Sequence, residues 1–453
     1  MKQKTTKTFL LRIMLGLALV LHTNSTLAQA WVPVGTAGFT PSSALISVMA
    51  LDASNTPYIF YKDILNEYKG TVMKFEDGSW QPVGEPGFSS SMQPGSNNFS
   101  LRFDNNNIPY VAYSGIPSDN YPIAVMKFEN NTWEVVAQFF SIGISDILLD
   151  FDSNNIPYLS YRSIQGEFVL LKFENNVWET VGSIASATIG SIFTFNNNNI
   201  PYVAFRDGEN NNKATVMKFE NGSWQFVGQP GFSSGGTEDL SLSFDSNNIP
   251  YIAYSDQTNQ NKATVQRCVN NNWEFVGESG FTGSYLGDIT IAFDSSDNLF
   301  ICYREQATGY KAAVKKFVNG IWQPVGPSTG FSEGMAISLS FSIGNNGVLY
   351  SGYSDDEYSA KTTVMKFDPT AGVETSVFNQ VEMYPNPASQ SVTLTNLAEN
   401  TAIKITDLTG KLIYSTKAVG ASLTIDTTGF TSGLYLVELM GYEGNVVKKL
   451  VIK

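Results

Sequence analysis

Residues 240–277 have the sequence LSLSFDSNNIPYIAYSDQTNQNKATVQRCVNNNWEFVG, in which four short apolar runs are separated by polar turns. The runs LSLSF, IPYIAYS, KATVQRC and WEFVG are rich in β-branched and aromatic residues, which predicts strands. The separating segments are rich in Asn and Asp, which tolerate the positive φ that tight hairpins need. The stretch therefore predicts one four-stranded antiparallel unit.

The unit recurs along the chain. Its tryptophan occurs at positions 31, 80, 133, 178, 224, 273 and 322, so neighbouring copies are 45 to 53 residues apart. Four short strands with a period in this range are typical of the blades of a β-propeller. Because the tryptophans recur at one register, we expect them to pack between blades and not to serve as platforms for a ligand.

The two ends of the repeat region complement each other. There are seven first, second and third strands, but MKFDPTAG from Met365 leads to no tryptophan, and the missing fourth strand is WVPVG at Trp31. We expect WVPVG to pair beside Met365 to Phe367 and to close a seven-bladed β-propeller over residues 31–368, leaving no open sheet edge. An open solenoid would need capping repeats, which the sequence lacks.

The first thirty residues predict a secretory signal peptide. Four basic residues precede the apolar run IMLGLALVL, and the small-residue stretch TLAQA follows it. Cleavage after Ala28 or Ala30 would start the mature chain just before Trp31. No later stretch predicts a transmembrane segment.

The C-terminal region has a different pattern. Beyond a linker at residues 369–382, residues 383–453 contain short alternating runs that predict a small all-β domain, a β-sandwich. The ordered motifs PNP, DLTGK, GLYLVEL and KKLVIK resemble the C-terminal sorting domain of the type IX secretion system, and the preceding repeats look like bacterial extracellular propellers. This resemblance implies export through the periplasm to the cell surface, with the type IX translocon as the partner of the tail.

Composition excludes several functions. Without the signal peptide, 24 Lys and Arg stand against 41 Asp and Glu, a net charge of −17, which argues against nucleic acid or an anionic membrane as a partner. The only histidine, His22, lies in the signal peptide, so catalytic triads with an imidazole base and the usual His-bearing zinc sites are excluded from the mature protein. A glycosidase that uses two carboxylates needs no histidine and stays open.

Some repeated and deviating positions carry separate expectations. We expect the turn acids Asp52, Asp104, Asp152, Asp245 and Asp294 to cap hairpins as Asx turns. A calcium site is the weaker alternative, since no later carboxylate follows and two units have Asn196 or Ser342 instead; no other cofactor is expected. Cys268 and Cys302 replace core residues of the repeat, so buried thiols are expected, with a disulfide between adjacent blades as the alternative.

The ends of the second strands vary between units. By propeller geometry these ends share a face with the long connections that follow each fourth strand, which is the usual binding face of such rings. The predicted ligand-binding residues on this face are Lys62, Arg162, Arg206, Asp207, Arg304 and Glu305. The arginines could converge on an anionic group such as a carboxylate or sulfate; arginines paired with neighbouring acids on a solvated face are the alternative.

These features favour an exported binding or adhesion propeller with a glycan or a surface protein as its partner. The alternatives are a sialidase-like glycoside hydrolase, in which two of Asp207, Asp256, Glu305 and Asp355 act as acid and nucleophile, and a structural surface component without a pocket. One contact is predicted inside the ring: Arg102 and Asp150 share a register in the first strands of consecutive blades and should pair across their interface.

Overall fold

The computed structural model describes residues 30–44, 46–92, 99–116, 123–139, 143–163, 165–188, 190–284, 286–369, 381–398, 401–441 and 444–453. The predicted signal peptide, apart from Ala30, and most of the predicted linker lie outside these residues. The chain divides into two compact units, one covering Ala30–Pro369 and the other containing the C-terminal residues up to Lys453.

The larger unit is all-β. In the described part of this unit the strands form seven four-stranded antiparallel sheets, which we number in chain order. Sheet 1 contains β2 (Ser47–Leu51), β3 (Pro57–Asp63), β4 (Lys69–Glu76) and β5 (Ser79–Pro82); sheet 2 contains β6 (Phe99–Phe103), β7 (Pro109–Ser114), β8 (Ile123–Glu129) and β9 (Thr132–Phe139); sheet 3 contains β10 (Gly143–Phe151), β11 (Pro157–Ser163), β12 (Phe168–Glu174) and β13 (Val177–Ile184).

The remaining sheets follow the same plan. Sheet 4 contains β14 (Ile192–Phe195), β15 (Pro201–Asp207), β16 (Lys213–Glu220) and β17 (Ser223–Phe226); sheet 5 contains β18 (Thr237–Phe244), β19 (Pro250–Asp256), β20 (Lys262–Val269) and β21 (Asn272–Phe275); sheet 6 contains β22 (Leu286–Phe293), β23 (Leu299–Glu305), β24 (Lys311–Val318) and β25 (Ile321–Pro324); sheet 7 contains β26 (Ala336–Ile343), β27 (Leu349–Asp355), β28 (Lys361–Phe367) and β1 (Val32–Pro33). Short 3-10 helices follow the second strands of five sheets: η1 (Ile64–Asn66), η3 (Gly208–Asn210), η4 (Gln257–Asn259), η5 (Gln306–Thr308) and η6 (Asp356–Tyr358).

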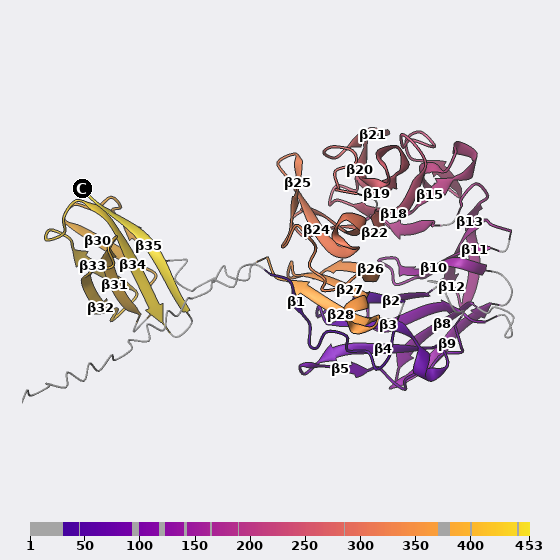
Figure 1. Ribbon diagram of the computed structural model, residues 1–453, viewed down its shortest axis with the longest axis horizontal. Helices are drawn as coiled ribbons and strands as arrows, with labels where there is room; N and C mark the ends of the chain where they lie inside the picture. Colours follow the sequence, from indigo (N-terminus) through magenta and orange to yellow (C-terminus); the bar gives the residue numbers. More distant parts are fainter. Residues whose placement is uncertain are drawn as a thin grey trace, which may run out of the picture. The chain divides into compact units, whose positions relative to one another are not determined.

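The first strands lie toward the middle of this unit and the fourth strands on its outside, as the labels β2, β10, β18, β22 and β26 against β5, β9, β13, β21 and β25 show in Figure 1. Strand β26 contacts both β22 and β2. Strand β1 pairs with β28, with Val32 opposite Lys366 and Pro33 opposite Met365.

The tryptophans pack between sheets, as predicted. The indole N–H of Trp80 donates to the carbonyl of Val34 at 2.8 Å, and its ring stacks on Phe39 with centroids 4.0 Å apart. Four other tryptophans make the same two contacts: Trp31 with Val325 and Phe331, Trp133 with Val83 and Phe88, Trp273 with Val227 and Phe232, and Trp322 with Val276 and Phe281.

Trp178 and Trp224 are exceptions, because their indole N–H groups are buried without a hydrogen-bond partner among the described residues. The sheets that precede them, 2 and 3, lack the Gly-Phe pair that supplies the stacking ring elsewhere. The fourth strands of sheets 2 and 3, β9 and β13, are also eight residues long and pair with the third strands through a bulge. In these two sheets the strand continues at the position where the other sheets supply the carbonyl that accepts the indole N–H.

The hairpins between first and second strands are closed by Asx turns, as predicted. The Asp52 Oδ1 atom accepts the N–H groups of Ser54 at 2.9 Å and Thr56 at 2.8 Å. Asp104, Asp152, Asp245 and Asp294 each accept the corresponding pair of N–H groups. In the described residues no group of three or more His, Cys, Asp or Glu side chains is arranged to hold a metal ion.

Two units close this turn without an aspartate. Asn196 accepts the N–H groups of Asn198 and Ile200 with its amide oxygen, so it replaces the acid directly. In sheet 7 the equivalent residue is Gly344, because its N–H donates to Val348 as the Asp52 N–H donates to Thr56. The assignment of Ser342 to this position was therefore wrong, since Ser342 lies within β26 opposite Tyr350.

The same turns are joined from sheet to sheet. The N–H of Ala53 donates to Oδ1 of Asn107 in the next sheet at 2.8 Å. Asn107 is the fourth residue of its turn and has a positive φ. Equivalent bonds run from Asn105 to Asn155, Ser153 to Asn199, Asn197 to Asn248, Ser246 to Asp297 and Asn345 to Asn55. The junction from sheet 6 to sheet 7 has Gly347 at the accepting position.

Two further expectations are settled by individual contacts. The Arg102 Nε atom lies 3.8 Å from Asp150 Oδ1, which confirms the predicted pair between sheets 2 and 3. Burial raises the pKa of the Asp150 carboxyl, while the positive charge of Arg102 opposes this rise. Cys268 and Cys302 are both buried free thiols, and burial raises the pKa of each.

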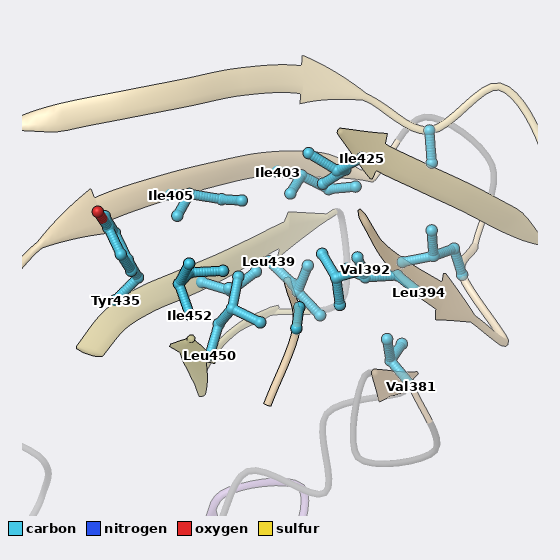
Figure 2. Packing of buried hydrophobic residues seen from close by; sticks show 14 residues of the cluster. Val381, Val392, Leu394, Ile403, Ile405, Ile425, Tyr435, Leu439, Leu450 and Ile452 are labelled. Carbon is cyan, nitrogen blue, oxygen red and sulfur yellow. The ribbon is translucent and has the colours of Figure 1, made fainter. Parts of the chain in front are cut away.

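The C-terminal unit is a separate two-sheet structure. One sheet has the order β29 (Glu382–Tyr384), β30 (Ser391–Thr395) and β33 (Ser422–Asp426), and the other has the order β32 (Leu412–Lys417), β31 (Ala402–Asp407), β34 (Gly433–Gly441) and β35 (Gly444–Ile452). Figure 2 shows that apolar side chains from both sheets, including Leu394, Ile403 and Leu439, form one core. Among the described residues of the whole chain, no helix has the length and apolar character needed to cross a membrane.

Candidate functional site

A central cavity is shared by all seven sheets of the larger unit. Its volume is about 570 Å³, and residues from the first strands of all seven sheets line it. The lining is largely aliphatic, with Leu148, Ile192, Leu240, Ile289 and Leu339 among its residues. The side chains at the mouth of this cavity are therefore the first candidates for a binding site.

In three sheets an acidic residue comes just before the first lining residue of the first strand, and we call this end of the cavity its mouth. Asp239 directly precedes the lining residue Leu240, Asp288 directly precedes Ile289, and Asp146 stands two residues before Leu148. Each acid has a positive φ, from 47° to 55°, and lies where the pairing of the first and second strands shifts register at a bulge. Bulges re-aim side chains, and Asp tolerates this backbone conformation better than most residues.

Arginines from the second strands meet these acids. The Arg304 Nε atom donates to Asp288 Oδ2 at 2.8 Å, and both side chains are largely buried, 23% and 28% exposed. Asp288 Oδ2 also accepts the N–H of Leu339 in the next sheet, at 3.3 Å. This carboxylate therefore holds the arginine and ties β22 to β26.

Asp239 is influenced by charged groups of both signs. The side chain is exposed at the mouth, yet the surrounding protein, together with the negative charges of Asp288 and Glu238, raises its pKa to about 6. The positive charges of Arg304 and Arg206 act on it in the opposite direction. We call Arg206, Asp239, Asp288 and Arg304 the mouth cluster.

A similar pair flanks the cluster in sheet 3. Asp146 Oδ2 accepts the N–H of Gly190 at 3.0 Å, and burial raises the pKa of Asp146 while Arg162 acts to lower it. The Nε atoms of Arg162 and Arg206 are buried and have no hydrogen-bond partner among the described residues. Both guanidinium groups thus retain a donor that is not used inside the described protein.

The other predicted ligand-binding residues have different surroundings. Asp207 is buried and accepts the N–H of Glu209 at 3.1 Å, the Asn210 amide at 2.9 Å and the Thr215 hydroxyl at 2.8 Å. These bonds cap the 3-10 turn of its own hairpin. Asp63 and Asp256 make the corresponding three bonds in sheets 1 and 5.

Glu305 and Lys62 are also buried. Glu305 accepts the N–H of Gly283 at 2.9 Å and so holds the long connection that precedes sheet 6. Burial lowers the pKa of Lys62 to about 8. Of the six predicted residues, Arg304 pairs with Asp288, while Arg162 and Arg206 each act through their charge on an acid of the mouth. Lys62, Asp207 and Glu305 lie within the protein interior.

The acids of the mouth are absent from the residues predicted by sequence. A signal for them exists: SDILLDF, EDLSLSF and GDITIAF place an aspartate just before the apolar run of the first strand in sheets 3, 5 and 6. The corresponding residue in sheet 7 is Ser338, which has a φ of 56° at the same bulge. An acid that recurs in some units and not in others marks a position that packing alone does not determine.

The C-terminal unit has a clear relative. Residues 382–453 match the secretion system C-terminal sorting domain, so this part of the chain belongs to that family. A chain carrying this type IX sorting domain is exported to the cell surface or beyond. No curated protein sequence matches the chain.

Several solved structures resemble the chain at low identity. PorZ, a surface component of the type IX secretion system of Porphyromonas gingivalis, is 14% identical, with 87% of this chain and 64% of PorZ covered and a TM-score of 0.36. The chain thus spans less than two thirds of PorZ. The Aleuria aurantia lectin in complex with Fucα1-6GlcNAc is 11% identical, with 64% and 96% covered and a TM-score of 0.43. An α-L-arabinofuranosidase of Fusarium graminearum is 10% identical, with 74% and 96% covered and a TM-score of 0.40.

Proposed function

We propose that residues 31–368 form a seven-bladed β-propeller closed by β1, carried to the cell surface by the sorting domain at residues 383–453. Two sets of contacts support closure. The N–H of Asn345 in sheet 7 donates to Asn55 in sheet 1 at 2.7 Å, continuing the series of bonds between turns. The Trp31 ring stacks on Phe331 at 3.9 Å, while the carbonyl of Val34 accepts from Trp80. The N-terminal segment is thus held by sheets on both sides.

The function that this geometry supports best is non-catalytic binding of a glycan at the mouth cluster. The observation that carries it is the pairing of Arg304 with Asp288 next to the cavity lining, beside an Arg206 whose Nε atom is buried without a partner among the described residues. Sugar hydroxyls both donate and accept hydrogen bonds, so they match a rim in which guanidinium donors alternate with carboxylate acceptors. An acidic sugar would in addition place its carboxylate against the arginines.

The glycosidase alternative receives less support. Asp207, Asp256, Glu305 and Asp355 are at most 7% exposed and accept hydrogen bonds from their own hairpins or the adjoining connection. A general acid and a nucleophile must reach the glycosidic bond from opposite sides. Asp355 has one oxygen, Oδ2, without a hydrogen-bond partner among the described residues, but this atom is buried away from a substrate.

The proposal is tested by a glycan array with the mature chain, residues 31–453, and with an Arg206→Ala/Arg304→Ala variant. We expect the variant to lose at least tenfold in affinity for acidic glycans at low salt. Its thermal unfolding is measured in parallel, because Arg304→Ala also removes the partner of the largely buried Asp288. Lys404→Ala/Lys411→Ala, which removes two exposed positive charges from the sorting domain, serves as the matched control. Unchanged binding in the mouth variant would refute the mouth as the glycan site.

A further inference from the structure

Two clefts between neighbouring sheets have the same composition. One, of about 580 Å³, lies between sheets 1 and 2, and the other, of about 310 Å³, lies between sheets 5 and 6. Both volumes suit a small ligand. Tyr58 and Lys74 line the first cleft, and Tyr251 and Arg267 line the second.

The equivalence extends to the rest of each cleft. Pro82 in the first cleft corresponds to Phe275 in the second, each two residues after the tryptophan, and Phe275 is 50% exposed. Asn107 in the first corresponds to Asp297 in the second, each being the fourth residue of the hairpin turn of the next sheet. Each cleft therefore combines an apolar surface with a hydroxyl, a basic group and a turn side chain that carries a hydrogen-bond acceptor.

The basic side chain of each cleft already forms an ion pair with a glutamate. Lys74 lies 2.8 Å from Glu76, and Arg267 lies 2.7 Å from Glu274 and donates to the Tyr251 hydroxyl at 3.5 Å. The clefts also contain Glu85 or Asp297, so their charge does not favour an anion. An apolar surface with several neutral or balanced polar groups matches a neutral sugar ring, which has apolar C–H groups and several hydroxyls.

The tyrosine and its basic partner recur around the larger unit. They face each other across the second and third strands in six of the described sheets: Tyr58 and Lys74, Tyr110 and Lys127, Tyr158 and Lys172, Tyr202 and Lys218, Tyr251 and Arg267, and Tyr350 and Lys366. Sheet 6 has Phe300 in place of the tyrosine, with the Lys316 ammonium 5.3 Å from the ring centroid. Phenylalanine is thus compatible with this position.

We propose that these two clefts, together with the other sheet interfaces that carry the same tyrosine and basic pair, are a second class of site, which binds neutral monosaccharide units weakly and gains avidity from repetition. These sites lie on the face of the hairpin turns that carry Asn107 and Asp297, opposite the mouth cluster. The inference does not depend on glycan binding at the mouth. Repeated weak sites bind a dense surface far more tightly than a single sugar.

The test uses the mature chain on polyacrylamide-linked neutral monosaccharides printed at low and high density. We expect density-dependent binding of the wild type to at least one sugar, with competition by the free sugar only at millimolar concentration. Tyr58→Phe/Tyr251→Phe should reduce high-density binding several-fold, and Phe at all six tyrosines should abolish it. Arg206→Ala/Arg304→Ala is the matched control and should bind these sugars normally.

Two outcomes overturn the proposal: no neutral monosaccharide bound at high density, or binding that the double tyrosine variant leaves unchanged. The double variant keeps the test valid if the sixfold variant fails to fold, because Phe300 already occupies this position in sheet 6. A failure of the mouth proposal is recognised separately, by acidic glycans that bind the Arg206→Ala/Arg304→Ala variant as well as the wild type.

Discussion

The protonation state of Asp239 sets the net charge of the mouth cluster, in which the charges of Arg206 and Arg304 act on its carboxyl. Its carboxyl has a pKa of about 6 because the surrounding protein and the nearby Asp288 and Glu238 disfavour the charged form. Above that pH the cluster has two positive and two negative groups. Below it Asp239 is neutral, and the cluster has a net positive charge.

We predict that an anionic glycan binds the mouth more tightly as the pH falls from 7 to 5, by up to about tenfold per pH unit if one proton is taken up with the ligand. Protonation removes a negative charge beside Arg206 and Arg304, which favours the anion. Asp239→Asn should bind with high affinity throughout this range. Titration calorimetry at three pH values measures the effect, and a wild-type affinity that is flat with pH would contradict it.

Lys62 offers a second residue-scale prediction, on stability. Its pKa is lowered from 10.5 to about 8 by burial, so between these pH values the unfolded chain binds a proton that the folded chain does not. The contribution of Lys62 to the free energy of unfolding therefore rises with pH through this window and is lowest below pH 8. Lys62→Met should be more stable at pH 7 by up to about 3 kcal/mol, with the gain shrinking by pH 10.

Denaturant unfolding at both pH values tests the Lys62 prediction. Lys69→Met, at a side chain that is 37% exposed, is the control and should change little. Comparing each variant with the wild type at the same pH cancels the titration of the tyrosines. If the stability gain of Lys62→Met over the wild type were larger at pH 10 than at pH 7, the prediction would be wrong.

At the scale of elements, the tryptophans differ in a way that can be measured. Trp133 donates to the Val83 carbonyl and stacks on Phe88, whereas the Trp178 indole N–H has no partner among the described residues. Tryptophan to phenylalanine at 133 removes the hydrogen bond and leaves a carbonyl without its donor, so it should cost about 1–3 kcal/mol more than the same change at 178. Equal losses of unfolding free energy at the two positions would refute this account.

The turn-to-turn bonds suggest a stabilising change. Gly347 has a φ of 78°, no atom lies within 4 Å of the place that a Cβ would take, and the residue occupies the position where other sheets have the accepting Asn or Asp. Gly347→Asn should therefore accept the N–H of Ser295 and raise the free energy of unfolding by about 0.5–1 kcal/mol. Gly320→Asn is the control for the backbone effect, because Gly320 has a φ of 85° and also has no atom within 4 Å of its Cβ position. It lies in the hairpin between third and fourth strands, which is not part of the series of turn-to-turn bonds.

The strands and turns are predictable from sequence because their signals are local: Asn and Gly at positive φ, Pro at the second strand and a recurring tryptophan. The Arg102 and Asp150 pair follows from register alone. Only half of the mouth cluster can be predicted from the sequence. Its arginines lie at the predicted strand ends, but the positions of its acids depend on bulges in the first strands. Such bulges are fixed by packing around the cavity, and a comparison of repeats that assumes regular pairing does not reveal them.

The same reasoning explains the buried acids. The variation of the second-strand ends predicts Asp207 as a ligand-binding residue, but its carboxylate is fully used by Asn210, Thr215 and the backbone of its own turn. The pattern DxxN with a threonine eight residues after the Asp recurs in sheets 1, 4 and 5. Residues that recur together with their hydrogen-bond partners indicate a structural role. The predicted arginines do not recur with such partners.

For the whole molecule, the sorting domain and the larger unit are separate compact units, so they should act independently. We predict that deletion of residues 369–453 retains the protein inside the producing cell, while the remaining chain keeps its thermal unfolding transition. Cell fractionation and calorimetry of the purified deletion variant measure the two effects. Surface display without the tail would contradict the assigned role of residues 382–453.

The proposed closure by the N-terminal strand makes the final prediction, because β1 pairs with β28 of sheet 7 although it comes from the other end of the repeat region. Deleting residues 31–35 exposes the edge of β28, removes the Trp31 ring from Phe331 and leaves the Trp80 indole without the Val34 carbonyl. The loss of one large buried aromatic alone should lower the free energy of unfolding by about 3–5 kcal/mol. The open edge should also promote aggregation.

Trp31→Ala separates these two effects. It should lower stability by a similar amount while the backbone of β1 remains to cover β28, so the variant should elute as a monomer. The deletion should unfold at a lower temperature and elute partly as oligomers in size-exclusion chromatography. A deletion variant that is monomeric and as stable as the wild type would mean that β1 does not close the ring, because an exposed β28 edge and an unpaired Trp80 indole cannot both be without cost.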